Sequence, residues 1–325
     1  MKKILFKLIG KIYSPYLRLD YNSIFKEKRN RKHLQEFAES EVKNVFFKIH
    51  ARFKGYRLIN NYVDTKKKSD TVFIIGSGES INELSRKDWN WIKKNNIIGL
   101  NYSFVHPVIP DYHLMEMIPL KDMQKFFCEN TKERYMNVDI FFQYKHVLKS
   151  GFDIKKYAYI RRVMVHVPHL YPTSSPNVLK SLFNNLKKKN DVVLSHLVHH
   201  NSHIGCAVMF AQALGYKNIV MLGIDLNGGS YFTDSHIISS EFPYNEDYET
   251  INRLRKRHFD NVKEFQNSIH PTMDKALMSE RSGLMMDEYF KVYKEVFIDN
   301  SSCNLYIGSE KSRLSKILPV YEFEN

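Results

Sequence analysis

Cysteine is scarce in this sequence of 325 residues. The three cysteines, Cys128, Cys206 and Cys303, are odd in number and far apart. This excludes a disulfide framework or a thiolate metal site and favours a reducing compartment. No apolar run approaches the ~20 residues that a membrane-spanning helix needs, and there are no internal repeats or low-complexity tracts. With 43% hydrophobic and 26% charged residues, the composition is that of a globular chain with room for one large domain or two modest ones.

Positive charge is concentrated at one end of the chain. Of the formal net charge of +14, residues 1–69 contribute +12, because they hold 18 Lys and Arg against 6 Asp and Glu. The remaining residues are almost neutral, whereas a nucleic-acid enzyme more often spreads basic residues over its reading surface. We therefore expect no nucleic-acid partner. We expect residues 1–69 to form a basic helical extension that associates with an anionic membrane surface.

The first 20 residues have the pattern of an interfacial anchor. Lysines alternate with Ile and Leu so that a helix would place them largely on separate faces. The same lysines interrupt the apolar centre that a signal peptide requires, and no small-residue cleavage site follows. We expect a cytoplasmic protein held peripherally on the inner face of the cytoplasmic membrane through residues 1–20. An ordinary basic surface helix is the alternative.

From residue 70 onward the sequence changes to α/β texture. Thr71–Ile75 is a short β-branched run typical of a strand buried on both faces, and Ile97–Leu100 is a second one. Between them stands a glycine turn, and then a helix predicted from Ile81 to about Lys94, with Ser80 and Glu83 as its capping box. A strand, a capped helix and a second strand predict a parallel sheet.

The same texture returns in the second half. A small-residue apolar helix over Ile204–Leu214, closed by Gly215, leads to a buried strand at Ile219–Leu222. After Met285 a final helix and the strand Asn304–Ile307 follow. Residues 232–270 are polar and charged, and we expect a lid-like insertion there. The prediction is a Rossmann-like parallel sheet in a single nucleotide-binding domain, with a small lid and the basic helical extension.

Ligands of open α/β sheets bind beyond the carboxyl ends of the strands, so three loops are candidates: Gly76–Ser80, Asn101–Ser103 and Asp225–Tyr231. In the first, two glycines allow a close backbone approach, and a helix N-terminus favours anions. The turn is neither a GxGxxG fingerprint nor a P-loop, and a purely structural turn stays open. Asp225 serves a ligand or caps its own loop.

Histidines supply the candidate proton acceptors. His270 follows the lid-like segment, and its ordinary pKa near 6.5 suits a general base. The cluster His199, His200 and His203 looks like a metal site, but no carboxylate or cysteine accompanies it at a familiar ligand spacing. We therefore expect no zinc.

Taken in order, these pieces resemble the bacterial sialyltransferases of glycosyltransferase family 42, which decorate lipooligosaccharide and capsule. The stretch from Ala213 to Tyr231 is similar to the helix, strand and active-site loop of that family. The glycine turn resembles its nucleotide loop, and His270, followed by Asp274-Lys-Ala-Leu, matches the place of its catalytic histidine. The resemblance covers residues 70–325, the expected glycosyltransferase domain, and excludes the basic extension.

The resemblance implies a CMP-nonulosonate donor, a glycan acceptor and an inverting displacement. His270 would take the acceptor proton and Tyr231 would stabilise the departing CMP phosphate, with Asp225 as a third catalytic candidate. The implied donor-binding residues are Gly76, Ser77, Gly78, Ser80, Asn101, Glu116, Ser202, Asn227, Gly229 and Ser230. No Asp-x-Asp loop occurs anywhere in the chain, and a reaction without metal or other cofactor fits both this absence and the family.

Two departures leave alternatives open. Asn227 replaces the second of two phosphate-contacting tyrosines, and Glu116 stands about where the family has an asparagine. A carboxylate there is compatible with a retaining transferase of the CMP-Kdo type. A phosphoryl-transfer enzyme, or a non-catalytic nucleotide-binding protein, are the further alternatives. The sequence leaves the particular sugar, the acceptor and the choice between monomer and homo-oligomer open.

Overall fold

The computed structural model describes residues 31–116, 119–154, 163–171, 173–190, 192–227, 230–234, 239, 241–259, 270–281, 283–299 and 301–323. The predicted anchor at residues 1–20 and the predicted donor contact Gly229 lie outside these ranges, as do parts of the predicted lid. Among the helices in the described ranges, none has the length and apolarity that crossing a membrane requires.

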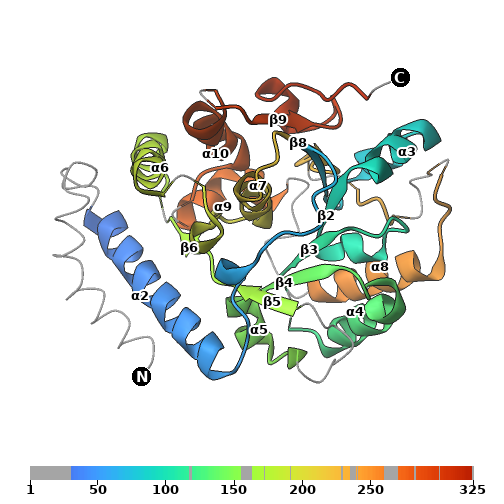
Figure 1. Ribbon diagram of the computed structural model, residues 1–325, viewed down its shortest axis with the longest axis horizontal. Helices are drawn as coiled ribbons and strands as arrows, with labels where there is room; N and C mark the ends of the chain where they lie inside the picture. The colour runs from blue at the N-terminus through green and yellow to red at the C-terminus, as the bar shows by residue number, and fades with distance from the viewer. Residues whose placement is uncertain are drawn as a thin grey trace.

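A seven-stranded sheet forms the centre of the molecule (Figure 1). Its strands are β1 (Thr71–Ile75), β2 (Asn96–Leu100), β3 (Tyr112–Met115), β4 (Asp139–Gln143), β5 (Val163–His166), β8 (Asn218–Leu222) and β9 (Asn304–Ile307). Their order is β5-β4-β3-β2-β1-β8-β9, and every pairing is parallel. The predicted Rossmann-like sheet is confirmed, including the four strands read from the sequence. The strands β3, β4 and β5 had not been predicted.

Helices cover both faces of the sheet. They are α2 (Arg31–Phe53), α3 (Arg86–Lys94), α4 (Lys121–Arg134), α5 (Tyr144–Ser150), α6 (Pro176–Asn190), α7 (His203–Ala213), α8 (Glu246–Phe259), α9 (Lys275–Glu280) and α10 (Met286–Tyr293), which a π-helical turn (Lys294–Ile298) continues. Alternate residues of β1 enter different cores: Val72 and Ile74 pack with α6, α7 and α10, whereas Phe73 and Ile75 pack with α3, α4 and α8. The period-two alternation of a strand thus builds a three-layer domain.

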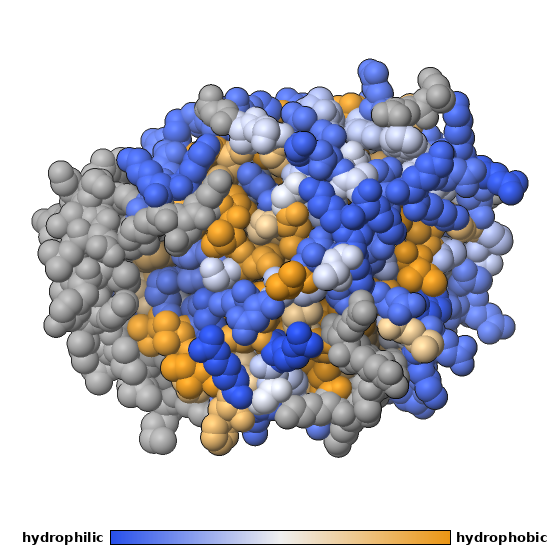
Figure 2. Space-filling model, viewed as in Figure 1, coloured by the Kyte–Doolittle hydropathy of each residue, from blue (hydrophilic) through white to orange (hydrophobic). Residues whose placement is uncertain are grey.

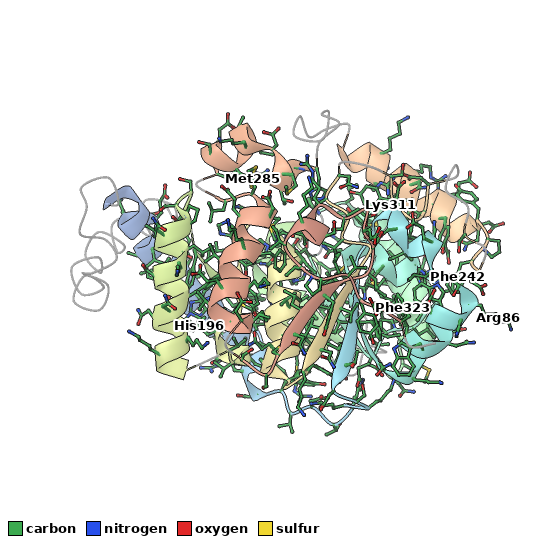
Figure 3. The ribbon with its side chains drawn as sticks, turned by 90° about the horizontal axis from the view of Figure 1, so that it is seen from above. Arg86, His196, Phe242, Met285, Lys311 and Phe323 are labelled. Atoms are coloured by element: carbon green, nitrogen blue, oxygen red, sulfur yellow. The ribbon has the colours of Figure 1, made fainter. Side chains whose placement is uncertain are left out.

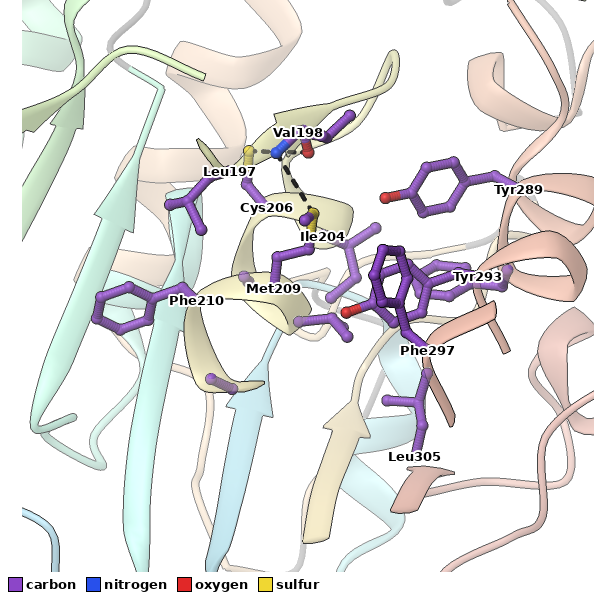
Figure 4. Close-up of a cluster of buried hydrophobic side chains, with 14 of the residues drawn as sticks. Leu197, Val198, Ile204, Cys206, Met209, Phe210, Tyr289, Tyr293, Phe297 and Leu305 are labelled. Atoms are coloured by element: carbon purple, nitrogen blue, oxygen red, sulfur yellow. Dashed lines mark hydrogen bonds between the residues drawn. The ribbon is translucent and has the colours of Figure 1, made fainter. Parts of the chain in front are cut away.

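Helix α7 is the most buried helix of one face, as its small and apolar residues predicted. It ends at Ala213, and Gly215 follows with a left-handed φ of +78° and an N–H that donates to the Gln212 carbonyl at 2.9 Å, a glycine-terminated helix end. Figure 4 shows how α7 holds the two-residue strand β7 (Val198–His199), which pairs with β6 (His169–Leu170). The Val198 N–H donates to Met209 Sδ at 3.3 Å, and Cys206 Sγ donates to the Val198 carbonyl at 3.3 Å.

One predicted helix begins at a different residue. The chain from Glu79 to Glu83 forms a 3₁₀ turn, η3, and α3 starts only at Arg86. The predicted capping box at Ser80 is therefore wrong. The real box uses Ser85 and Asp88, whose side chains and backbone N–H groups bond reciprocally. Ser80 is not free to cap a helix because its N–H and hydroxyl both bond Asp225.

The described part of residues 31–69 packs on the body and is not a separate unit. Phe37, Ala51, Leu58 and Ile59 are buried in the two cores, and Leu58 forms a bridge with Val165 of β5. The predicted boundary at residue 69 therefore cuts through packed structure. The described part of the predicted lid also packs on the body: α8 lies against α4 on the flank of the sheet (Figure 1), with Ile251 and Leu254 in the core.

The sheet has a switch point between β1 and β8. From β1 the chain builds outward through β2 to β5 on one side, and it returns to add β8 and β9 on the other. Loops that leave the carboxyl ends of β1 and β8 diverge there, which opens a crevice in folds of this class.

Candidate active site

A cavity of about 190 Å³ occupies this crevice at the carboxyl ends of β1, β2 and β8. Ten residues singled out from the sequence line it: Gly76, Ser77, Gly78, Asn101, Ser202, Asp225, Asn227, Ser230, Tyr231 and His270. The wall also contains Leu100, Tyr102, His203, Ile204, Gly223, Ile224 and Leu226. Two further predicted donor contacts, Ser80 and Glu116, stand behind this wall. Five segments that are distant in sequence thus meet at one site.

The glycines of the first loop are required by the protein itself. A Cβ on Gly76 would lie 2.4 Å from Ile224 Cδ1, and a Cβ on Gly78 would lie 2.3 Å from Asp225 Oδ2. Their N–H groups donate to the carbonyls of Leu222 and Gly223, each at 2.8 Å. At these two positions the N–H groups of the turn therefore bond the loop after β8.

Asp225 anchors that loop. Its Oδ2 accepts from the Ser80 N–H at 3.0 Å and its Oδ1 from the Ser80 hydroxyl at 2.5 Å. Burial raises the pKa of this carboxyl, although the two bonds from Ser80 oppose the shift. Both oxygens are engaged, so the geometry makes Asp225 a residue that joins the two loops. Ser80 is its partner and lies away from the cavity.

The loop after β8 is also fixed from the C-terminal side. Lys311, labelled in Figure 3, accepts on its carbonyl a 2.8 Å bond from Asn227 Nδ2. The Ser312 hydroxyl donates to the Ile224 carbonyl at 2.6 Å, and the Arg313 N–H donates to the Asp225 carbonyl at 3.0 Å. The predicted donor contact Asn227 therefore uses its amide donor in holding the loop.

Backbone strain gathers around the cavity. The non-glycine residues with positive φ in the described ranges are Asn101 at +46°, Asn201 at +53° and Leu226 at +58°. Asn101 and Leu226 line the cavity, and Asn201 precedes Ser202 of its wall. Such conformations cost about 1–3 kcal/mol each and concentrate at functional sites. Leucine in this region is particularly uncommon.

Two tyrosines, Tyr102 and Tyr231, belong to the cavity wall. Burial raises the pKa of both, against the opposing effect of Arg255, so both hydroxyls stay protonated and can donate. The Arg255 guanidinium lies 3.6 Å from the Tyr231 ring centroid and bonds Asp234 Oδ1 at 2.6 Å, while Asp234 Oδ2 accepts from the Tyr231 N–H at 2.8 Å. Sequence reasoning missed Tyr102 and Arg255. The adjacency of Tyr102 to Asn101 was the available signal for the first.

The free helix end at the site belongs to α7. Ser202 is its N-cap, with the hydroxyl accepting from the Ile204 N–H at 3.4 Å, and Ser202, His203 and Ile204 line the cavity. The positive end of a helix dipole favours an anionic group such as a phosphate. The anion-attracting helix end is thus at α7, whereas the sequence had suggested the glycine turn.

His270 lines the cavity in a form that differs from the expected base. Its Nδ1 accepts from the Thr272 N–H at 3.3 Å and lies 2.8 Å from the Thr272 hydroxyl. A neutral ring with Nδ1 as acceptor carries its proton on Nε2. Burial lowers the pKa of His270 to about 4. In this arrangement Nε2 is a hydrogen-bond donor, and burial holds the pKa below the ordinary value of 6.5.

The remaining histidines divide into separate roles. His200 is structural, because it stacks on Tyr289, accepts from the Leu284 N–H at 2.8 Å and lies 3.2 Å from the Tyr171 carbonyl. His199 Nε2 lies 2.8 Å from Glu116 Oε1. In the part of the chain that the structure describes, no three His, Cys, Asp or Glu side chains form a group suited to a metal ion.

Fold and site together define a Rossmann-like α/β protein with a cavity of mixed polar and apolar lining at its switch point. No family model matches the chain, and no curated protein matches its sequence. Two solved structures are similar to it over most of its length. The monofunctional α-2,3-sialyltransferase Cst-I from Campylobacter jejuni is 14% identical with a TM-score of 0.42, the similarity covering 82% of this chain and 86% of that one. An apo α-2,3-sialyltransferase from the same organism is 14% identical with a TM-score of 0.39, covering 83% and 87%. Both are of the class that the sequence resembles.

Proposed function

We propose that this chain is a glycosyltransferase that moves a sialic-acid-like nonulosonic sugar from a CMP-sugar to a glycan of the cell surface, with inversion. One observation carries the proposal. The residues that the sequence resemblance assigns to donor binding and catalysis come from five separate segments, and ten of them line a single cavity. The loops after β1, β2 and β8 would meet at this edge in any parallel sheet. Ser202 and His270 come from outside these loops, and they line the same cavity.

The cavity wall offers matched chemistry for the leaving group. The N-terminus of α7 and the protonated hydroxyls of Tyr102 and Tyr231 are suited to a phosphate whose charge grows as the glycosidic bond breaks. Asn101 uses its Oδ1 to accept from the Glu116 N–H at 2.9 Å, which leaves its NH₂ donors for a ligand.

The nucleotide preference gives the direct test. We expect CMP and CDP to raise the melting temperature of the purified protein, while UMP, GMP and ADP leave it unchanged, because a ligand that binds only the folded state stabilises it. An equal response to all nucleotides, or a response only to a purine nucleotide, would count against a CMP-sugar donor.

We further propose that transfer needs no divalent metal. The two aspartates that a phosphoryl-transfer enzyme would require near the cavity are both engaged, Asp225 by Ser80 and Asp234 by Arg255. Turnover of a CMP-sugar should therefore continue in excess EDTA. A complete loss that magnesium restores would favour the phosphoryl-transfer class and a metal-dependent reaction.

We also propose that the protein binds anionic membranes. The strongly basic residues 1–69 contain helix α2. The exposed apolar side chains of α2 are Val45, Phe46, Ile49 and Phe53. Apolar surface gathers at the lower left of Figure 2, in the region of the C-terminal part of α2. We expect sedimentation with vesicles containing anionic lipid, release by salt, and weaker binding after deletion of residues 1–20. Equal binding to neutral vesicles would contradict this.

A further inference from the structure

A cluster of ionisable side chains lies beside the cavity, over the strands that the sequence did not reveal. Its members are Glu116 after β3, His146 on α5, His166 at the end of β5, His199 in β7 and His203 at the start of α7. The cluster adjoins the cavity through two wall residues: Asn101 accepts from the Glu116 N–H, and His203 belongs to both.

The centre of the cluster is a carboxylate–imidazole pair. Glu116 Oε1 lies 2.8 Å from His199 Nε2 and 3.8 Å from His146 Nε2. Burial alone would raise the pKa of Glu116, but His203, His199 and His146 together hold it below its ordinary value. An ionised carboxylate can only accept, so the proton of a neutral His199 resides on Nε2 and the lone pair on Nδ1. No group in the described ranges is seen to bond that Nδ1.

This is the arrangement by which a carboxylate prepares a histidine as a general base. The carboxylate fixes the tautomer and stabilises the imidazolium that forms. The side chains of Glu116, His199 and His146 keep 21%, 14% and 28% of their surface exposed, so a ligand can reach them. The two sulfur contacts of Val198 hold the backbone next to His199 in place.

His203 provides an independent sign of a ligand. It is 3% exposed and lines the cavity, yet its Nδ1 has no partner among the described residues. His166, 1% exposed, stacks on it with an unpartnered Nδ1 and an Nε2–Nε2 distance of 3.2 Å. Because one Nε2 must donate to the other, one ring presents an Nδ1 donor and the other an Nδ1 acceptor. Buried polar atoms without partners cost about 1–3 kcal/mol each, a cost that a hydroxylated ligand would remove.

Charge indicates which part of the substrates belongs here. An ionised Glu116 disfavours an anionic group beside it, whereas the backbone N–H groups at the α7 N-terminus and the tyrosine hydroxyls of the cavity wall favour one. A phosphate therefore fits the β1–β8 side, and a neutral sugar bearing hydroxyls fits the β3–β5 side.

We propose that the Glu116–His199 pair is the general base of the reaction and that the cluster around it is the subsite for a neutral, hydroxyl-bearing acceptor sugar. This rests on the proposed function. The acceptor oxygen forms its bond to the anomeric carbon while the bond from that carbon to the CMP phosphate oxygen breaks and leaves its electron pair on the phosphate. The hydroxyl proton passes to His199 Nδ1, and Glu116 balances the imidazolium. His270, whose Nε2–H is a donor, would give a hydrogen bond to a substrate and would not take the acceptor proton.

The test compares His199→Asn with His270→Asn, and uses His196→Asn as the matched control. His196 lies beside α6 (Figure 3), bonds Tyr171 and stacks on His169, away from the cavity. The donor probe is CMP-N-acetylneuraminic acid, and the acceptors are lactose with other neutral oligosaccharides, against their sialylated forms. Donor affinity, donor hydrolysis and transfer are measured separately in every variant.

We expect wild type to transfer to the neutral set. His199→Asn should lose about 100-fold or more in kcat for transfer and keep donor affinity within about twofold. It should melt below wild type, because the shorter Asn amide does not reach Glu116 as Nε2 does, whereas the amide of His199→Gln does. His270→Asn should lose less in transfer. Should His199→Asn fail to fold, His199→Gln replaces it. Near-normal transfer in His199→Asn, or wild-type transfer only to sialylated acceptors or to neither set, overturns the proposal.

A pH profile separates a proton-transfer role from a structural one. Glu116→Gln removes the negative charge that balances a protonated imidazole 2.8 Å away, so the acid limb of kcat/KM should move to lower pH. The other charged groups facing the pair, Lys145 and His146 on α5, His166 on β5 and His203 on α7, are unchanged in this variant. An unmoved limb, or a product that keeps the donor's anomeric configuration, overturns the assignment. A wild-type protein that neither binds CMP nor cleaves the donor instead refutes the proposed function, and this is known before any acceptor is added.

Discussion

The two halves of the carboxyl edge of the sheet differ in how completely their polar groups are hydrogen-bonded. At the β1–β8 half, the loops bond one another: Gly76 and Gly78 donate to carbonyls of the β8 loop, and both oxygens of Asp225 accept from Ser80. At the β3–β5 half, His166 and His203 each keep a buried nitrogen without a partner in the described ranges, and Glu116 is surrounded by histidines. The first half is a frame whose shape is fixed, and the second holds groups whose protons can move.

The difference follows from the residue types that the strands deliver. Loops with glycine and aspartate can approach each other closely and satisfy their backbone groups locally, which gives a stiff edge. A neutral histidine offers one donor and one acceptor, and protonation turns the acceptor into a second donor. A histidine-rich edge therefore responds to pH and to ligands. Under the proposed function, this division would separate binding of the donor from proton transfer, and each half can be tested on its own.

Acid should have the largest effect. It should act through buried histidines, of which His113 and His203 lie at the β3–β5 half. Burial lowers the pKa of His106 and His113 to about 3, and the pKa of His200, His203 and His270 to about 4. The unfolded chain titrates its histidines near 6.5 and therefore binds more protons below that pH, so stability is complete above 6.5 and falls as the pH drops toward 4. At pH 5 the five groups together cost about 10 kcal/mol, comparable with the whole stability of a domain.

We therefore expect cooperative unfolding above pH 4.5, measured by urea denaturation at a series of pH values between 8 and 4.5. Hydrogen exchange at pH 5.5 should show β3 to β5 opening before the β1–β8 loops, and return to pH 8 should restore the protein. A free energy of unfolding that stays level between pH 7 and 5 would show that these histidines are not held neutral.

The contribution of the β1–β8 loops to nucleotide binding is tested by adding a methyl group at a glycine where they meet. In Gly78→Ala the new Cβ would lie 2.3 Å from Asp225 Oδ2 and 2.9 Å from the Gly223 carbonyl oxygen. We expect a loss of about 2–3 kcal/mol from overpacking and a tenfold or greater loss of CMP affinity, measured by thermal shift with and without CMP. Gly151→Ala is the control: its φ of +66° costs backbone strain, but nothing lies within 4 Å of the new atom. It should lose about 1 kcal/mol and keep CMP affinity. Equal nucleotide binding in both variants would mean that the frame does not shape the site.

Sequence reasoning succeeded where the residues of a short segment alone determine its secondary structure. The runs at β1, β2 and β8 are continuous and β-branched, and the helix at α7 has small residues followed by a glycine, so their types and places were predictable. It failed at β3 to β5 because these strands hold polar residues inside the protein, such as His113, Asp139 and Gln143. Their partners lie on other elements: Tyr135 for His113, and Tyr62 for Asp139.

The site shows the same division. The loops at the switch point were predictable as a group, since the carboxyl ends of parallel strands meet at one edge. What each residue does was not. Asp225 is a bridge between loops, and the neutral His270 carries its proton on Nε2, because their partners Ser80 and Thr272 fix these roles and no sequence pattern encodes the contacts. The Glu116–His199 pair joins residues 83 positions apart, which no spacing rule connects.

The smallest expected effect on stability and turnover concerns Tyr231, which belongs both to the rigid β1–β8 loops and to the cavity wall. Its backbone pairs with Gly78 of the frame, while its ring lies under Arg255. Arg255 in turn bonds Asp234, which accepts from the Tyr231 N–H. If the guanidinium orients the ring as a planar surface, charge alone will not replace it.

We expect Arg255→Lys and Arg255→Met each to lose about 1–2 kcal/mol of stability, since the ion pair is largely shielded and the ring contact contributes about 0.5–2 kcal/mol. CMP should still bind, because the β1–β8 frame is intact, but kcat should fall several-fold in both variants as the Tyr231 hydroxyl loses its fixed position. Arg257→Met on the same helix is the control, since its pair with Asp122 is exposed and should contribute little. If Arg255→Lys turned over like wild type while Arg255→Met did not, the positive charge near the leaving phosphate would be the important property, and Tyr231 would belong with the electrostatics of the site, not with its rigid frame.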